Sequence, residues 1–198
     1  MDDIKENLDT KSLLNFISEA GMLKRVPRSG WSVLGIKDAE SVADHCFRCA
    51  VIGYVLASME NVAPYKILLM TLFNDIHEAR ITDLHKMAQR YFNITEGEKK
   101  SFEDQIEFLP DSINKELSEV RKDYNIQESQ ESRIARDADI LECLLQAKDY
   151  SEHGYPEAVK FMEKAPDFLI TNSAKRLWNT AKNMNLNDWW VHLTQFTR

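Results

Sequence analysis

A short stretch of the sequence, residues 73–85 (FNDIHEARITDLH), carries several side chains that are able to bind a cation. It follows an apolar run in a helix predicted to begin at Pro64, so Asp75 is expected to be carried into the protein interior. Asp75 and Glu78 are three residues apart and would share one helix face, with Asp83 beyond them at the predicted helix end. An unpaired buried carboxylate costs several kcal/mol or becomes protonated. The converging acids therefore predict a bound cation.

His45 is a further candidate ligand, on a helix predicted over residues 42–59. Steps of four and eleven residues from it reach Cys49 and Leu56, so the imidazole is expected to project toward the core. A lone histidine on such a face is usually held by ordinary hydrogen bonds. The preceding Asp44 and the acid cluster one helix later favour the other interpretation, a metal ligand.

Asp139 is the remaining acidic candidate, inside a second core helix predicted over residues 131–150. It lies between two apolar residues, so it is either a paired structural carboxylate or a further metal ligand. Asp137, two residues earlier, points in a different direction and is expected to be solvated.

The segment 23–41 precedes the His45 helix and is expected to be a loop, because Pro27 and two glycines interrupt it. Arg25, Arg28 and Trp31 lie close together in this loop. Two arginines beside a tryptophan suit the recognition of a phosphate and a base. The alternative, which the sequence does not separate from the first, places the basic residues on the surface and the tryptophan in the core.

Three cysteines, Cys46, Cys49 and Cys143, are too few for a disulfide framework. The first two form a CxxC, a spacing that serves redox chemistry or zinc binding in other proteins. No second cysteine pair and no βαβ pattern accompanies it, so both are expected to be small buried core residues.

Helical periodicity, without sustained alternation of apolar and polar residues, predicts an all-α protein. A chain of 198 residues that is 43% hydrophobic is long enough for one domain with a single core. Besides the helices named above, helical patterns are found at residues 10–23 and 85–92, on both sides of Pro110 between residues 95 and 125, and around Phe161 and Trp178.

Charge and hydropathy argue against several function classes. The net charge of −7 disfavours binding of a nucleic acid polymer, which relies on a basic surface. The acidic, polar start of the chain differs from a secretory signal, and no membrane-length apolar segment is expected. We therefore expect a cytoplasmic protein without a membrane partner.

Three motifs together carry a family resemblance: ESVADH with His45, LFNDIHEARITDLH with Asn74 and Asp75, and RDADILE with Asp139. They resemble the HD-domain phosphohydrolase superfamily, most closely its 5′-deoxynucleotidase branch. The resemblance covers about residues 13–155 and includes the loop sequence LKRVPRSGW. It implies that the four named residues hold a divalent metal ion, for which their oxygen-rich donor set would suit manganese, cobalt or magnesium.

The same resemblance implies a single HD-type helical bundle over residues 1–198, with its core at about residues 13–155. The tail, residues 156–198, would pack on this core or at a dimer interface. A homodimer is the expected assembly.

The activity implied by the resemblance is hydrolysis of a deoxyribonucleoside 5′-monophosphate to a deoxynucleoside and phosphate. Glu78 and Asp83 would orient or deprotonate the attacking water and assist the leaving oxygen. Arg28, and Arg25 beside it, would hold the phosphate, and Trp31 would border the sugar or the base.

Position 74 departs from the family pattern, because Asn74 stands where the family has a histidine. An amide oxygen binds first-row divalent metals more weakly than an imidazole nitrogen does. Three interpretations follow: weak coordination by Asn74, partial compensation by His77, or reduced metal affinity and turnover. His77 lies two residues beyond Asp75 and so points off the ligand face. The sequence leaves three alternative functions open: a phosphohydrolase that acts on another nucleotide, a metal-impaired nucleotide-binding protein, and a helical domain with paired buried charges.

Overall fold

The computed structural model describes the backbone of residues 2–194 and the side chains of residues 10–191 and 193. This described part is built from helices; it contains no strand, and one isolated bridge pairs Pro27 with Ser41. The prediction of an all-α protein is therefore confirmed. The α-helices are α1 (Asp2–Ala20), α2 (Val42–Met59), α3 (Pro64–Phe73), α4 (Glu78–Ile81), α5 (Lys86–Gln89), α6 (Ile94–Ile106), α7 (Asp111–Ile126), α8 (Gln130–Glu152), α9 (Val159–Lys164) and α10 (Asn172–Ala181). Short 3-10 helices are η1 (Gly21–Arg25), η2 (Ser29–Leu34), η3 (Pro156–Ala158), η4 (Ala165–Phe168) and η5 (Asp188–Thr194).

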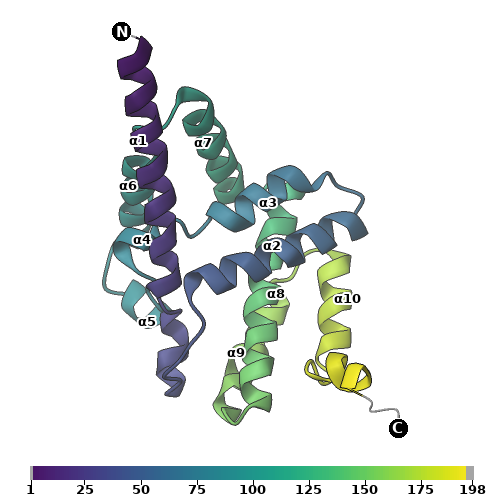
Figure 1. The fold of residues 1–198 in the computed structure, drawn as a ribbon. Coiled ribbons are helices and arrows are strands. Elements are labelled where there is room, and N and C mark those ends of the chain that lie inside the picture. Colours follow the sequence, from purple (N-terminus) through teal and green to yellow (C-terminus); the bar gives the residue numbers. More distant parts are fainter. Residues whose placement is uncertain (1, 195–198) are drawn as a thin grey trace.

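Helices α2, α3 and α8 form the centre of the molecule, where α2 crosses over α8 (Figure 1). Their apolar faces supply most of the main core, including Leu56, Ile67 and Leu141, and α10 packs on the same core through Trp178. Burial of each such side chain contributes roughly 1.5–3 kcal/mol to the stability of the fold, so these three helices are packed firmly together. Residues that lie on their facing sides are thereby held in fixed positions.

Helix α2 begins and ends where its pattern predicts. Ser41 and Asp44 form a reciprocal capping box at its start, because each side chain bonds to the other residue's backbone N–H. By length and composition alone α2 is apolar enough to cross a membrane, but half of it is buried inside the protein. Burial of this kind is expected of a core helix in a helical domain.

The helix predicted to run from Pro64 past Glu78 is in fact interrupted. Helix α3 ends at Phe73, a turn follows, and α4 starts at Glu78. The turn uses tighter bonds between residues three apart, such as Glu78 N–H to the Asp75 carbonyl oxygen at 2.9 Å. Residues i and i+3 eclipse one another in such a turn, so Asp75 and Glu78 still face the same side. Thr82, with φ of 62°, then turns the chain away.

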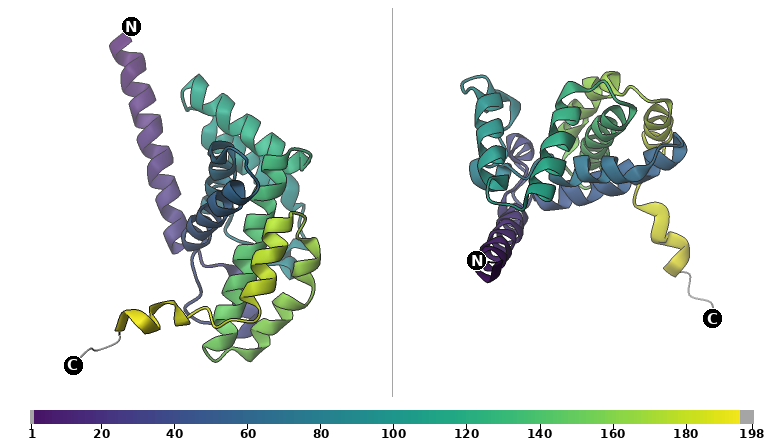
Figure 2. Two further views of the ribbon diagram at one scale, coloured as in Figure 1. Left: turned by 90° about the vertical axis from the view of Figure 1, so that its right-hand side faces the viewer. Right: turned by 90° about the horizontal axis from the view of Figure 1, so that it is seen from above.

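Several other elements begin or end at residues that differ from those the sequence patterns predict. Helix α1 begins at Asp2 and not at residue 10, and its upper part extends beyond the body of the protein (Figure 1). The predicted loop 23–41 contains no α-helix but two 3-10 helices. The segment that contains η5 extends away from the other helices (Figure 2). The last four residues of the predicted tail, 195–198, lie outside the described residues.

Asp137 corrects the sequence analysis, which expected it in solvent. Its side chain is fully buried and accepts hydrogen bonds from Ile170 N (2.9 Å), Thr171 N (2.7 Å) and Thr171 Oγ1 (2.6 Å). Thr171 is the N-cap residue of α10. Asp137 thus fixes the tail to α8, because its carboxylate satisfies backbone donors next to a helix start that have no helical partner.

Candidate active site

A pocket of about 900 Å³ lies where the loop before α2, the end of α3, helix α4 and helix α8 meet. Each element contributes to it a side chain that the sequence analysis selected. Seven of the predicted site residues line this pocket: Arg28, Trp31, Asn74, Asp75, Glu78, Asp83 and Asp139. His45 is buried just beneath these residues, with an exposed fraction of 1%.

His45 is the point at which the predicted metal ligands meet. Its Nε2 lies 3.2 Å from Asp139 Oδ1 and 3.5 Å from Asp75 Oδ2, so helices α2 and α8 and the turn after α3 contribute to one small volume. Burial opposes a charge on the ring, but the neighbouring acidic groups outweigh burial and raise the pKa of His45 above its ordinary value. The same pairing lowers the pKa of Asp139 against the effect of its burial.

Asn74 lies next to these ligands and holds Asp75. Its Nδ2 donates to Asp75 Oδ1 at 2.8 Å, which leaves Oδ2 facing His45. The backbone oxygen of Asn74 accepts from Arg121 Nη1 at 2.9 Å and lies 3.0 Å from His77 Nδ1. The other ring nitrogen of His77 is directed to a glutamate at 3.8 Å. His77 therefore lies off the ligand side, as the sequence spacing indicates.

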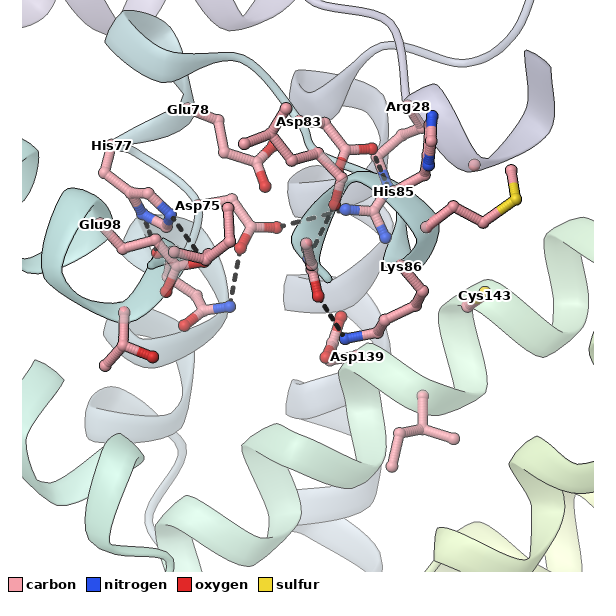
Figure 3. Close-up of a pocket in the computed structure, with 18 of the residues that line it drawn as sticks. Arg28, Asp75, His77, Glu78, Asp83, His85, Lys86, Glu98, Asp139 and Cys143 are labelled. Atoms are coloured by element: carbon pink, nitrogen blue, oxygen red, sulfur yellow. Dashed lines mark hydrogen bonds and ion pairs between the residues drawn. The ribbon is translucent and has the colours of Figure 1, made fainter. Parts of the chain in front are cut away.

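Glu78 and Asp83 bring two more carboxylates to the pocket (Figure 3). The Glu78 Oε2 atom is buried and has no hydrogen-bond partner. Burial, followed by the nearby charges of Asp75 and Asp83, raises the pKa of Glu78 to about 9. Asp83 instead accepts from the backbone N–H of Ser29 at 2.7 Å, and so ties the loop before α2 to the site.

Arg28 is the cation that faces this acid cluster. Its Nη1 lies 3.8 Å from Asp75 Oδ2 and its Nε 4.0 Å from Asp83 Oδ2, and Figure 3 shows it beside both acids. Burial opposes its charge, but the surrounding carboxylates outweigh burial and raise the pKa of the guanidinium. Arg28 is therefore charged and directed into the pocket.

The other two predicted substrate residues lie differently. Trp31 is 2% exposed, its Nε1 donates to Glu40 Oε1 at 2.9 Å, and its ring packs on Tyr150 and Phe161. It fills the core and only borders the pocket. Arg25 is exposed, contacts Met22 Sδ at 3.9 Å and does not line the pocket.

Sequence reasoning missed a part of the pocket wall that α7 and α8 form. Arg121 and Tyr124 of α7 and Arg136 of α8 line it. Arg121 lies 4.5 Å above the ring of Phe102, and Arg136 Nη1 lies 3.3 Å from Asp139 Oδ2. Amphipathic helices on the surface usually direct their arginines to solvent, so the sequence pattern carried no signal for this wall.

A second carboxylate on α8, Glu142, was also missed. It is fully buried and contacts His45 Nδ1, on the ring edge opposite Asp139. The available signal was its spacing, because Glu142 follows Asp139 by three residues and so lies on a similar face of α8. Glu142 stands between Leu141 and Cys143, and the apolar helix pattern drew attention to these neighbours instead.

Several side chains around His45 could serve as ligands of a metal ion. Two groups in the described part of the chain bring three ligating atoms within 4.8 Å of one another: His45 with Cys49 and Asp139, and His45 with Glu40 and Glu142. The first group contains two of the predicted ligands. With Asp75 and the unpartnered oxygen of Glu78 close by, an imidazole and several carboxylates converge, which fits a divalent cation.

Only one cysteine of the CxxC, Cys49, belongs to these groups in the described part of the chain, and Cys46 belongs to neither. Cys46 and Cys49 are free and buried. Cys49 Sγ lies 3.4 Å from His45 Nε2, but burial raises the pKa of the Cys49 thiol to about 12, which disfavours the thiolate that binds metals. The expectation of two small core residues agrees with this arrangement.

The chain is similar to known proteins over most of its length. A family model described as HD domain matches residues 20–178. The 5′-deoxynucleotidase HDDC2 of Homo sapiens is 32% identical over 147 residues, which cover 72% of this chain and 70% of that protein. HDDC2 of Dictyostelium discoideum is 30% identical over 174 residues, which cover 82% and 88%. The structure of a conserved hypothetical protein from Pyrococcus furiosus matches with a TM-score of 0.74 and 30% identity, over 86% of this chain and 99% of that one.

Proposed function

Because the chain belongs to the HD domain family, we propose that it hydrolyses deoxyribonucleoside 5′-monophosphates to a deoxynucleoside and phosphate with a divalent metal ion. The family resemblance expected from the sequence motifs is confirmed, and 5′-deoxynucleotidases are among the relatives. The observation that carries the proposal is the convergence of Asp75 and Asp139 on His45 Nε2, beside Arg28, in one pocket.

His45, Asp75 and Asp139 would hold the metal, with the Asn74 side chain as a weaker fourth ligand. Manganese, cobalt or magnesium suits this oxygen-rich set. When bound, the ion would supply positive charge that offsets the phosphate's negative charge and makes water more acidic.

The chain's own residues would do the rest of the chemistry. Arg28 is half-buried and charged, and its planar guanidinium would hold two phosphate oxygens at once. The Glu78 carboxyl, whose buried Oε2 has no hydrogen-bond partner, would give a proton to the leaving 5′ oxygen. Asp83 would orient the attacking water and keep the Arg28 loop in place through Ser29. Trp31 would border the nucleoside from its fixed place in the core.

Asn74 supports a second candidate function, a nucleotide-binding protein in which metal affinity and turnover are reduced. An amide replaces the more strongly binding imidazole at a position that touches Asp75. A hydrolase acting on another nucleotide is the remaining alternative, because the site chemistry concerns the phosphate more than the base.

Phosphate release from a panel of deoxy- and ribonucleoside monophosphates tests these functions, on the natural chain and on Asn74→His, with each of the three metals. Release from deoxynucleotides by the natural chain supports the proposal. Activity of Asn74→His alone supports the metal-impaired function, and binding without hydrolysis by either protein would contradict the nucleotidase proposal. Asp139→Ala serves as the metal-free control.

We propose a cytoplasmic homodimer that binds neither membranes nor nucleic acid polymers. Exposed apolar side chains in η5, with Trp189 69% and Leu193 73% exposed, support a contact with a second copy, and the net charge of −7 disfavours nucleic acid. Light scattering on the purified protein, compared with Trp189→Ser, measures the oligomeric state.

A further inference from the structure

Glu142 is a charged side chain with no exposure to solvent. A carboxylate in such a place is strongly unfavourable unless it is paired and hydrogen-bonded. The mechanism proposed above does not use it, because it lies behind His45 and does not line the pocket. Its partners therefore indicate what it does.

The two oxygens of Glu142 have separate partners. Oε1 accepts from Arg48 Nε at 2.9 Å and from Arg48 Nη2 at 2.6 Å. Oε2 contacts His45 Nδ1. Arg48 is itself held from two more sides, because its Nη2 also donates to Gln146 and lies 3.8 Å from Glu40 Oε2. Glu142 is thus fixed by Arg48 in a single position, with one oxygen left for the histidine.

This contact determines which edge of the His45 ring faces the acids. A carboxylate at Nδ1 accepts the proton of that nitrogen, so Nε2 is the nitrogen directed to Asp75 and Asp139, at 3.5 and 3.2 Å. Histidines that bind metals almost always donate the other ring N–H to a carboxylate or carbonyl, which fixes the ring and makes it a stronger ligand. Position 74 is asparagine, so His45 is the one imidazole in the proposed ligand set.

We propose that Glu142, held in place by Arg48, is the positioning residue that orients His45 for metal binding. This inference rests on the proposed metal site. A purely structural role for Glu142, in which it only neutralises Arg48, predicts a loss of stability with no effect on metal affinity. The two roles are therefore separable by experiment.

Glu142→Gln is the variant to test, because it keeps the shape of the side chain and an oxygen for Arg48 but removes the charge that faces His45. Glu131→Gln, a glutamate near the start of the same helix, is the matched control. We expect Glu142→Gln to bind Mn²⁺ about 10–100-fold more weakly than the natural chain, the range found for outer partners of metal-binding histidines. The control should bind as the natural chain does.

A measurement without metal reports on the orientation directly. In the ¹⁵N-histidine-labelled, metal-free protein, we expect a strongly downfield Nδ1 proton of His45, assigned by its absence in His45→Gln. It should move upfield or vanish in Glu142→Gln and stay in Glu131→Gln. If Glu142→Gln fails to fold, as judged by circular dichroism, Arg48→Gln at the partly exposed end of the network should still weaken Mn²⁺ binding by about 3–10-fold, below the range for direct partners.

The outcomes separate this inference from the proposed function. Mn²⁺ binding by the natural chain with equal affinity in Glu142→Gln would overturn the positioning role and leave the metal site standing. Absence of Mn²⁺ binding in the natural chain would overturn the proposed function, and the positioning role with it. A folded Glu142→Gln with weak Mn²⁺ binding and a lost Nδ1 signal supports both.

Discussion

Asp137 and Asp139 lie two residues apart on α8, and the structure gives them different surroundings. Asp137 is fully buried and binds the backbone before α10, whereas Asp139 faces His45 and the pocket. We predict that Asp137→Asn lowers stability but keeps metal affinity. Asp139→Asn should lose metal affinity, with the smaller effect on stability.

The magnitude for Asp137 follows from its three hydrogen bonds to Ile170 and Thr171. A hydrogen bond to a charged group contributes about 1.5–3 kcal/mol, and a neutral one about 0.5–1.5 kcal/mol. An amide has one acceptor oxygen, so it keeps the two Thr171 bonds at the weaker neutral strength, a loss of about 1 kcal/mol each. Its NH2 group faces the Ile170 N–H, which is left without an acceptor at a cost of about 1–3 kcal/mol. The unfolding free energy should therefore fall by at least about 3 kcal/mol. For a chain of this size that corresponds to a fall in Tm of about 6–12 °C.

For Asp139 the expected loss is in metal affinity. Removal of a charged ligand should weaken Mn²⁺ binding by more than about 100-fold, beyond the 10–100-fold typical of residues that only support a ligand. Thermal unfolding in chelator and Mn²⁺ titration of both variants measure the two effects. Arg133→Gln, exposed on the same helix, is the control for both. The reasoning is refuted if Asp137→Asn loses metal affinity as strongly as Asp139→Asn while its Tm is unchanged.

Three further predictions concern the core, the phosphate and pH. Gly53→Ala should lower the free energy of unfolding by about 1 kcal/mol, measured by urea unfolding. The new Cβ would lie 3.0 Å from Ile67 Cγ2, and overpacking of this kind costs about 1–3 kcal/mol. This cost exceeds the gain of about 1 kcal/mol from the higher helix propensity of alanine. Arg28→Lys should raise the KM for the nucleotide about tenfold or more and change Mn²⁺ affinity less. Lysine keeps the positive charge but cannot donate two parallel hydrogen bonds to the phosphate. An unchanged KM would exclude the phosphate-binding role of Arg28. The pKa of Glu78 is about 9 in the folded protein, above its ordinary value of 4.5, so protonated Glu78 favours the folded state. This contribution to the free energy of unfolding is fully present below about pH 4.5 and is lost as the pH rises through 9. Glu78→Gln should therefore flatten the fall in metal-free stability between pH 5 and 9, and an equally steep fall would contradict the assigned pKa.

Much of the fold was predictable because local signals agree with the packing. Helix α2 carries both a capping signal at Ser41 and an apolar stripe, and it forms where both indicate. The spacing that places His45 on this stripe also places it at the centre of the site. Where pattern, cap and burial coincide, sequence reasoning locates the residue and its direction.

The positions that could not be predicted depend on contacts between distant segments. Asp137 alternates with Asp139 along α8 and looks solvated, but the backbone at residues 170 and 171 folds back to cover it. Glu142 is similarly paired with Arg48, from a helix 94 residues away in sequence. The break after Phe73 also has no proline or glycine to mark it. Helix periodicity reports which face is apolar, and it does not report which charged groups meet across faces.

The family resemblance implies a histidine ligand at position 74, so Asn74 bears on how tightly the proposed site would bind its metal. Asparagine and neutral histidine carry the same charge, so the exchange leaves the electrostatic balance of the acid cluster and Arg28 unaltered. Asn74 still holds one oxygen of Asp75 and leaves the other directed to His45, and its backbone oxygen is fixed by Arg121. What the exchange removes is the affinity of a ring nitrogen for the metal. Asn74→His should therefore lower the metal concentration that gives half-maximal activity. The KM for the nucleotide at saturating metal should stay the same in this variant.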